Sequence, residues 1–132
     1  DLKITTIEKN EESFLQAKTN FFMCGVEKQI TPILSDAIDV DFANDSFDLI
    51  FIDGPKAQYT KYFNKFKASL KKGGLIVCDN ISFHNLTKES VSKNTAQLLK
   101  KLELFKSEVL ANSEFESKFI DIADGILVSK KL

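Results

Sequence analysis

The 132-residue sequence contains no arginine and no tryptophan, and it has only two cysteines, two prolines and five glycines. Without arginine there is no planar guanidinium clamp, so lysine, main-chain N–H groups or a metal ion must bind any phosphate or carboxylate. Cys24 and Cys78 lie far apart and lack the spacing of a zinc knuckle, which argues against a thiolate metal site and a disulfide framework. We therefore expect a reducing, cytoplasmic setting.

Long apolar runs are also missing. No stretch of about 18 apolar residues is present, so no membrane-spanning helix is expected, and the opening residues lack the pattern of a secretory signal. The formal net charge is −1 and the pI is about 5.9, which does not favour a nucleic-acid partner. Residues 36–53 hold six aspartates and no lysine, whereas residues 56–72 hold six lysines and no acid. The simpler interpretation is a solvated helix face beside an acidic loop.

Apolar spacing and turn residues predict an alternation of strands and helices. The strand Phe47–Ile52 is nearly continuous in apolar residues, which is typical of a strand covered on both faces. The alternation indicates an α/β fold with a mainly parallel sheet and a closing antiparallel hairpin, and the length suits a single domain over residues 1–132. The expected strands are 2–7, 30–34, 47–52, 75–78, 119–122 and 126–128, and the expected helices run from Glu11 to Gly25, from Tyr59 to a stop at Gly73-Gly74, and from about Glu89 to Leu110.

Polar side chains follow four of the predicted strands. Glu8 ends the first, Asp36 follows the second, Asp53 follows the third, and the pair Asp79 and Asn80 follows the fourth. In open α/β sheets, ligands bind beyond the carboxyl ends of the strands. One such acid is unremarkable because aspartate favours turns, but four in succession indicate a binding site.

The residues after the third and fourth strands suit a divalent cation. Asp53, Asp79 and Asn80 offer two carboxylates and one amide oxygen, a set of hard ligands that leaves open positions on Mg²⁺ or Mn²⁺. Lys56 is three residues past Asp53, and a lysine beside a bound cation gives up its proton more readily, so it is a candidate general base. A surface lysine at a helix start accounts for Lys56 equally well.

Other polar residues stay open to either interpretation. Glu8 is in the position of an acid that accepts from a ribose hydroxyl, but the glycine-rich turn that normally precedes such an acid is not in the sequence. Tyr59 and His84 need no function, as a helix aromatic and a loop histidine. Cys78 is most simply a buried core thiol.

Three segments together resemble a known family. FDLIFIDGPKAQYTKYF, LKKGGLIVCDNISFHN and DIADGILVSKK are similar to the cation-dependent O-methyltransferases that use S-adenosylmethionine, which include the caffeoyl-CoA and catechol enzymes. The resemblance covers essentially the whole chain and implies a Rossmann-like methyltransferase sheet. It implies metal ligands at Asp53, Asp79 and Asn80, catalysis by Lys56, and cofactor contacts from Glu8, Asp36, Ala37 and Asp53.

The resemblance also implies parts that the sequence lacks. Family members carry an N-terminal helical region and a first strand with the glycine-rich cofactor turn. We therefore expect the chain to be the C-terminal part of a class I methyltransferase domain, without a central strand between those of Ile4 and Phe47. Such a chain is expected to be inactive alone and to close the gap by re-pairing or to associate as a homodimer.

The acceptor is the least determined feature. GPKAQ and the pair Phe83 and His84 most resemble the bacterial branch that methylates 5-hydroxyuridine in transfer RNA. A 5-hydroxyuracil and a catechol both present two adjacent oxygens, so the cation site accommodates either a tRNA or a small acceptor such as a catechol or caffeoyl-CoA. Two alternatives remain: a non-catalytic α/β interaction module, and a receiver-like signalling domain, which the Asp79 and Asn80 pair and the closing hairpin disfavour.

Overall fold

The structure, a computed structural model of the chain, describes residues 2–82, 89 and 91–132. The described chain forms two compact units, the first ending at Asp41 and the second beginning at Phe42. Each unit has its own sheet, of two and four strands respectively. In the described residues, no helix is long and apolar enough to cross a membrane.

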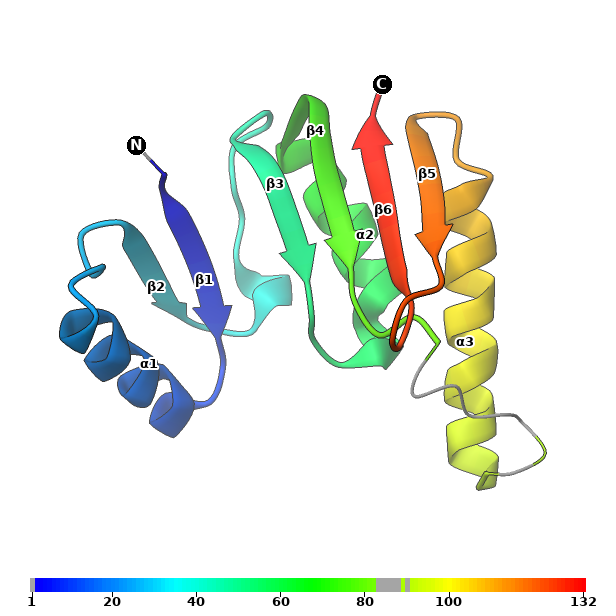
Figure 1. Cartoon of the computed structure of the whole chain (residues 1–132), viewed down its shortest axis with the longest axis horizontal. Coiled ribbons are helices and arrows are strands. Elements are labelled where there is room, and N and C mark those ends of the chain that lie inside the picture. The colour runs from blue at the N-terminus through cyan, green and yellow to red at the C-terminus, as the bar shows by residue number, and fades with distance from the viewer. Residues whose placement is uncertain (1, 83–88, 90) are drawn as a thin grey trace. The chain divides into compact units, whose positions relative to one another are not determined.

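The first unit is a parallel strand pair joined by one helix (Figure 1). Its elements are β1 (Ile4–Glu8), α1 (Glu11–Met23), β2 (Ile30–Leu34) and the short 3₁₀ helix η1 (Ala37–Asp39). Helix α1 begins at the predicted Glu11, where the Asn10 side chain accepts a hydrogen bond of 2.9 Å from the Ser13 N–H and caps the helix. It ends before Gly25, whose φ of 69° is the left-handed conformation that glycine adopts freely.

The second unit is a mixed sheet with the strand order β3-β4-β6-β5. Strands β3 and β4 are parallel, and β6 runs antiparallel to both of its neighbours. This confirms the α/β fold with a closing antiparallel hairpin. The elements are β3 (Phe47–Ile52), η2 (Lys56–Gln58), α2 (Tyr59–Phe66), η3 (Lys67–Ser69), β4 (Leu70–Cys78), α3 (Lys93–Leu110), β5 (Phe115–Ile120) and β6 (Ile126–Lys131).

The core of the second unit lies between its sheet and its two long helices. Helix α2 packs on β3 and β4, and α3 packs on β5 (Figure 1). The Phe105 ring contacts the rings of Tyr59 and Phe63 edge-on, with centroids 5.8 and 5.9 Å away. The buried cluster is Ile52, Tyr59, Phe63, Leu70, Ile76, Cys78, Ile81, Leu102, Phe105, Val109, Phe115 and Leu127.

Several predicted element boundaries are wrong; the strand expected at 119–122, for example, is Phe115–Ile120. The helix that starts at Tyr59 ends at Phe66 rather than at the glycine pair, and Leu70 already begins β4. The cause is a bulge: β4 carries extra residues where its register against β3 shifts, and Gly73 supplies a φ of 81° there. Similarly, the last long helix begins at Lys93 rather than near Glu89, because Ser92 caps it by accepting from the Thr95 N–H.

Within the second unit, helix packing covers one face of β3. Ile52 is buried against the helices, whereas Leu49 and Phe51, on the other face, are 56% and 60% exposed. The apolar run therefore corresponds to a strand with two apolar faces, of which the second unit covers one. Strands β1 and β3 belong to separate sheets of the two units, and the expected re-pairing or association stays a prediction.

Candidate active site

Polar side chains at the ends of β3 and β4 converge on the ammonium group of Lys56. Ile52 and Cys78 are opposite each other in the parallel register, so Asp53 and Asp79 leave neighbouring strands at the same edge. Lys56 Nζ donates to Asp53 Oδ1 at 3.2 Å and to Asn80 Oδ1 at 3.1 Å. The Lys56 side chain is only 12% exposed. The structure thus makes it a largely covered member of a cluster, not a surface lysine.

Tyr59 is the part of this cluster whose role the sequence left open. Its hydroxyl accepts from Lys56 Nζ at 2.6 Å and donates to the main-chain oxygen of Asp79 at 2.8 Å. Its side chain is fully buried, and burial, reinforced by the negative charge of Asp53, raises the pKa of Tyr59 above its ordinary value. The neutral phenol therefore ties Lys56 to the end of β4. In the sequence, the spacing of three residues between Lys56 and Tyr59 was the signal that could have indicated this contact.

The turn after β4 directs Asn80 into the cluster. Asn80 has a φ of 56°, a left-handed conformation that asparagine tolerates better than most residues. Asp79 Oδ1 accepts the Asn80 N–H at 2.8 Å, and Asn80 Nδ2 donates to Asp124 Oδ2 at 3.3 Å. Asp124, in the turn between β5 and β6, is a site neighbour that local sequence patterns do not distinguish from an ordinary turn residue.

The oxygen atoms of Asp53, Asp79 and Asn80 are ligands of the kind that a hard cation prefers. Asp53 and Asn80 already direct oxygens at one positive charge, and Asp53 keeps a half-exposed carboxylate. Within the described ranges, no group of three or more His, Cys, Asp or Glu residues forms a metal cluster; the expected set differs in having two carboxylates and an amide. The shared coordination shell of Asp53, Asp79 and Asn80 stays a prediction.

Cys78 lies directly beneath this cluster, at the end of β4. Its side chain is 1% exposed, and burial raises the pKa of the thiol from 9.0 to about 12, although the nearby Lys56 charge lowers it. This agrees with the prediction of a core thiol. Cys24, in contrast, is exposed.

The predicted cofactor residues Glu8, Asp36 and Ala37 lie in the first unit, at the carboxyl ends of β1 and β2. Glu8 Oε1 accepts the Asn10 N–H at 2.7 Å, and Asp36 Oδ1 accepts the Ile38 N–H at 3.1 Å and so caps η1. Their ribose and adenine contacts stay predictions. Phe83 and His84 are outside the described residues.

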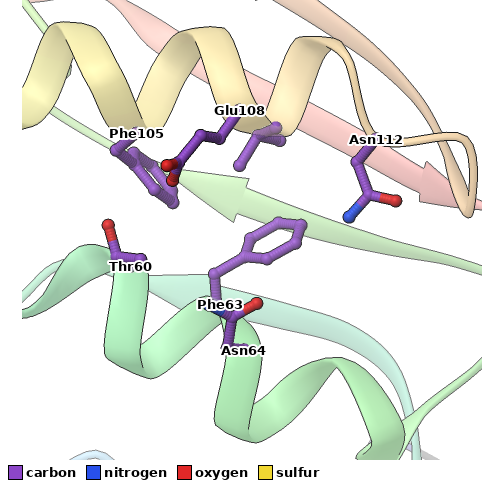
Figure 2. Close-up of a pocket in the computed structure, with 7 residues that line it drawn as sticks. Thr60, Phe63, Asn64, Phe105, Glu108 and Asn112 are labelled. Carbon is purple, nitrogen blue, oxygen red and sulfur yellow. The ribbon is translucent and has the colours of Figure 1, made fainter.

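The second unit also has a small pocket, which lies between α2 and α3. Figure 2 shows the Phe63 and Phe105 rings between these helices, with Thr60, Glu108 and Asn112 around them. At about 40 Å³, this pocket has room for a few water molecules and not for a cofactor. The cluster around Lys56 is therefore the candidate site.

Comparisons with known proteins agree with this fold. A family model described as O-methyltransferase matches residues 1–132. The caffeoyl-CoA O-methyltransferase of Populus kitakamiensis is 25% identical over 142 aligned residues, which cover 100% of this chain and 60% of the relative. A probable caffeoyl-CoA O-methyltransferase of Dictyostelium discoideum is 28% identical over 75% of this chain and 42% of its own length. The chain thus spans about half the length of these curated relatives.

Solved structures match nearly the whole chain. A Staphylococcus aureus protein assigned to the caffeoyl-CoA O-methyltransferases superposes with a TM-score of 0.88 at 31% identity, over 98% of this chain and 65% of that protein. The S-adenosylhomocysteine-bound Podospora anserina methyltransferase PaMTH1 gives 0.84 at 19% identity, over 98% of this chain and 61% of its own. The second likeness supports the fold alone.

Proposed function

Because the chain belongs to the O-methyltransferase family, whose model spans residues 1–132, we propose that it carries the cation-binding and catalytic side of an S-adenosylmethionine- and divalent-cation-dependent O-methyltransferase. One observation carries the proposal: Asp53 and Asn80 converge on the partly buried ammonium of Lys56 at the carboxyl ends of β3 and β4. A structural hydrogen-bond network would need neither the half-exposed carboxylate nor the strained turn at Asn80.

In this proposal, Asp53, Asp79 and Asn80 hold Mg²⁺ or Mn²⁺ through oxygen. The cation, when bound, would make an acceptor hydroxyl more acidic and orient two adjacent oxygens. Lys56 Nζ exchanges a proton with that hydroxyl, while Tyr59 fixes the nitrogen by its hydrogen bond of 2.6 Å. The low exposure of Lys56 limits competition from water.

We propose that Glu8 supplies the ribose contact of S-adenosylmethionine and that Asp36 and Ala37 lie beside its adenine. The positions of Glu8 and Asp36 past parallel strands support this assignment, because ligands of α/β sheets bind at that edge. The match of the O-methyltransferase family model to residues 1–132 supports the choice of a methyl-donor cofactor.

The proposed acceptor has two adjacent oxygens, and two substrate classes meet this requirement. The segment GPKAQ favours 5-hydroxyuridine in transfer RNA, whereas the curated relatives are named for caffeoyl-CoA. Nucleoside mass spectrometry of tRNA from a strain lacking the full-length gene separates them. Loss of 5-methoxyuridine supports the tRNA acceptor. Unchanged tRNA nucleosides, with methylation of a catechol by the full-length protein, support the small acceptor instead.

A non-catalytic interaction module is the competing class. In the full-length protein, transfer of a labelled methyl group from S-adenosylmethionine to either acceptor, abolished by a chelator and by Asp79→Ala, supports an enzyme. Absence of transfer to tRNA, catechol and caffeoyl-CoA in the presence of Mg²⁺ and Mn²⁺ contradicts the proposal.

A further inference from the structure

The side-chain amide of Asn80 has two ends, and only one of them suits the proposed site. An amide oxygen can face a cation, whereas an NH₂ group can only donate hydrogen bonds. A rotation by 180° exchanges the two ends with almost no change in shape. Whatever holds the amide in one orientation therefore decides whether Asn80 contributes an oxygen.

The two neighbours of the amide select the same orientation. Oδ1 of Asn80 lies 3.1 Å from the Lys56 ammonium, which can only donate. Nδ2 lies 3.3 Å from Asp124 Oδ2, and an ionised carboxylate can only accept. The reversed amide would set NH₂ against an ammonium and an oxygen against a carboxylate, so both contacts would become repulsive.

The turn that carries Asp124 is fixed against the segment that follows Asn80. The Ser82 N–H donates to the Asp124 main-chain oxygen at 2.8 Å, and the Ile81 N–H donates to that of Gly125 at 3.0 Å. A Cβ at Gly125 would lie 2.5 Å from Ser82 Oγ, so the turn approaches this segment as closely as glycine permits. The carboxylate of Asp124 is therefore carried by a turn bonded to the main chain beside Asn80.

We propose that Asp124 is a positioning residue, which holds the amide of Asn80 with Oδ1 directed toward the space shared with Asp53 and Lys56. Asp124 acts through Asn80 and touches no reacting atom. The nature of the cation in that space rests on the proposed function. The orientation of the amide does not, because Lys56 and Asp124 select it in the protein alone.

Nuclear magnetic resonance of the ¹⁵N-labelled 132-residue chain tests the orientation directly. The Asn80 side-chain signals are assigned by their loss in Asn80→Asp. In Asp124→Leu they should shift, and their protons should exchange with water about tenfold faster, because one hydrogen bond to a charged acceptor is lost. Asp124→Asn, which keeps an oxygen acceptor of the same size, should stay near the original chain and serves as the folded control. Unchanged Asn80 side-chain signals in Asp124→Leu would overturn the proposal.

A cycle of variants separates positioning from general support of the fold. With Asn80 present, Asp124→Leu should weaken Mn²⁺ binding about 10- to 100-fold, the usual effect of losing a partner of a metal ligand. In the Asn80→Asp background the ligand has two equivalent oxygens and is repelled by Asp124, so the same change should leave affinity unchanged or raise it. Equal losses in both backgrounds would overturn the positioning role. If the original chain bound no Mn²⁺, the proposed cation requirement would fail, and the resonance measurement alone would decide on Asp124.

Discussion

Lys56 is the residue on which the proposed chemistry depends most. Three side-chain acceptors, from Asp53, Tyr59 and Asn80, hold its ammonium at 2.6 to 3.2 Å, and the main-chain oxygen of Asp79 accepts at 3.5 Å. Such a fixed nitrogen is well placed for proton transfer, since a general base must lie within hydrogen-bond reach of the group it serves. The same contacts explain why a long, flexible side chain adopts a single position.

We predict that Lys56→Met in the full-length protein lowers kcat about 10²- to 10⁴-fold, with little change in the affinity for S-adenosylmethionine. Methionine keeps the length of the side chain and removes its proton-transfer group. Lys61→Met, on the exposed face of α2, is the matched control and should leave kcat unchanged. Steady-state kinetics at saturating substrate measure the effect. A loss of less than tenfold would reduce Lys56 to a positioning role.

The two thiols should differ sharply in reactivity. Burial raises the pKa of Cys78 to about 12, so at pH 8.5 fewer than about one in a thousand of these thiols are ionised. We predict that iodoacetamide labels the exposed Cys24 in the native chain and labels Cys78 only in denaturant. Peptide mass spectrometry after timed labelling reads both sites. Equal native rates would contradict the burial of Cys78.

The raised pKa of Cys78 also has a consequence for stability at alkaline pH. Because the native value lies above the unfolded one, its contribution is complete below about pH 9 and is lost as the pH rises through 12. The free energy of unfolding should therefore fall by up to about 1.4 kcal/mol per pH unit in that window, and Tyr59 acts in the same direction. Cys78→Val should flatten the fall, whereas Cys24→Val should not.

Strand ends explain which site residues were predictable. Parallel strands end at one edge, so Asp53, Asp79 and Asn80 are identified by their place in the sequence alone. Tyr59 and Asp124 are not, because a tyrosine on an apolar helix face looks like core, and an aspartate before glycine looks like a turn. Their contacts depend on how α2 and the β5–β6 turn pack, which local patterns do not encode.

The turns show the same division between local and long-range information. Asn10 and Gly25 bound α1 as predicted, since capping depends on neighbours within one turn. The Gly73-Gly74 pair was misassigned because a bulge within a strand and a helix stop both use glycine. Only the pairing of β4 with β3 decides between them.

The turn between β5 and β6 offers a test with an internal control. Gly125 and Gly73 have nearly the same φ, 78° and 81°, but a Cβ at Gly125 would lie 2.5 Å from Ser82 Oγ, whereas nothing lies within 4 Å at Gly73. Gly73→Ala should cost about 1 kcal/mol from backbone strain alone. Gly125→Ala should cost about 3 kcal/mol, because steric overlap adds to the strain.

Urea unfolding followed by tyrosine fluorescence measures both glycine variants. The two tyrosines, Tyr59 and Tyr62, both lie in the second unit, so the signal reports that unit. Equal losses for the two variants would contradict the close contact of the turn with Ser82.

The sequence indicates less about the assembly of the chain than about its elements. The nearly continuous apolar run identifies β3 as a strand with two apolar faces, but it does not reveal which parts of the chain cover them. In the structure, Leu49 and Phe51 stay exposed on one face. Strand β3 is also an edge of its sheet, with main-chain groups available to another strand.

We therefore predict that the 132-residue chain self-associates in a concentration-dependent way. Exposed apolar side chains next to a free strand edge favour contact with a second copy. Phe51→Glu should reduce association, and Leu104→Glu, at an exposed leucine of α3, is the control that should not. Sedimentation velocity between about 5 and 200 μM measures the effect. A monomer throughout that range would contradict the prediction.

The central claim is that the ends of β3 and β4 form a cation site, and paramagnetic broadening by Mn²⁺ tests it most directly. In the ¹⁵N-labelled chain, substoichiometric Mn²⁺ should broaden the amide signals of Gly54, Ile81 and Gly125 first, because they adjoin Asp53, Asn80 and Asp124. Asp79→Ala should abolish this pattern. Asp48→Ala, which removes a carboxylate paired with Lys71 instead, should preserve it. Broadening centred on the aspartates of residues 36–48, or no selective broadening, would contradict the account.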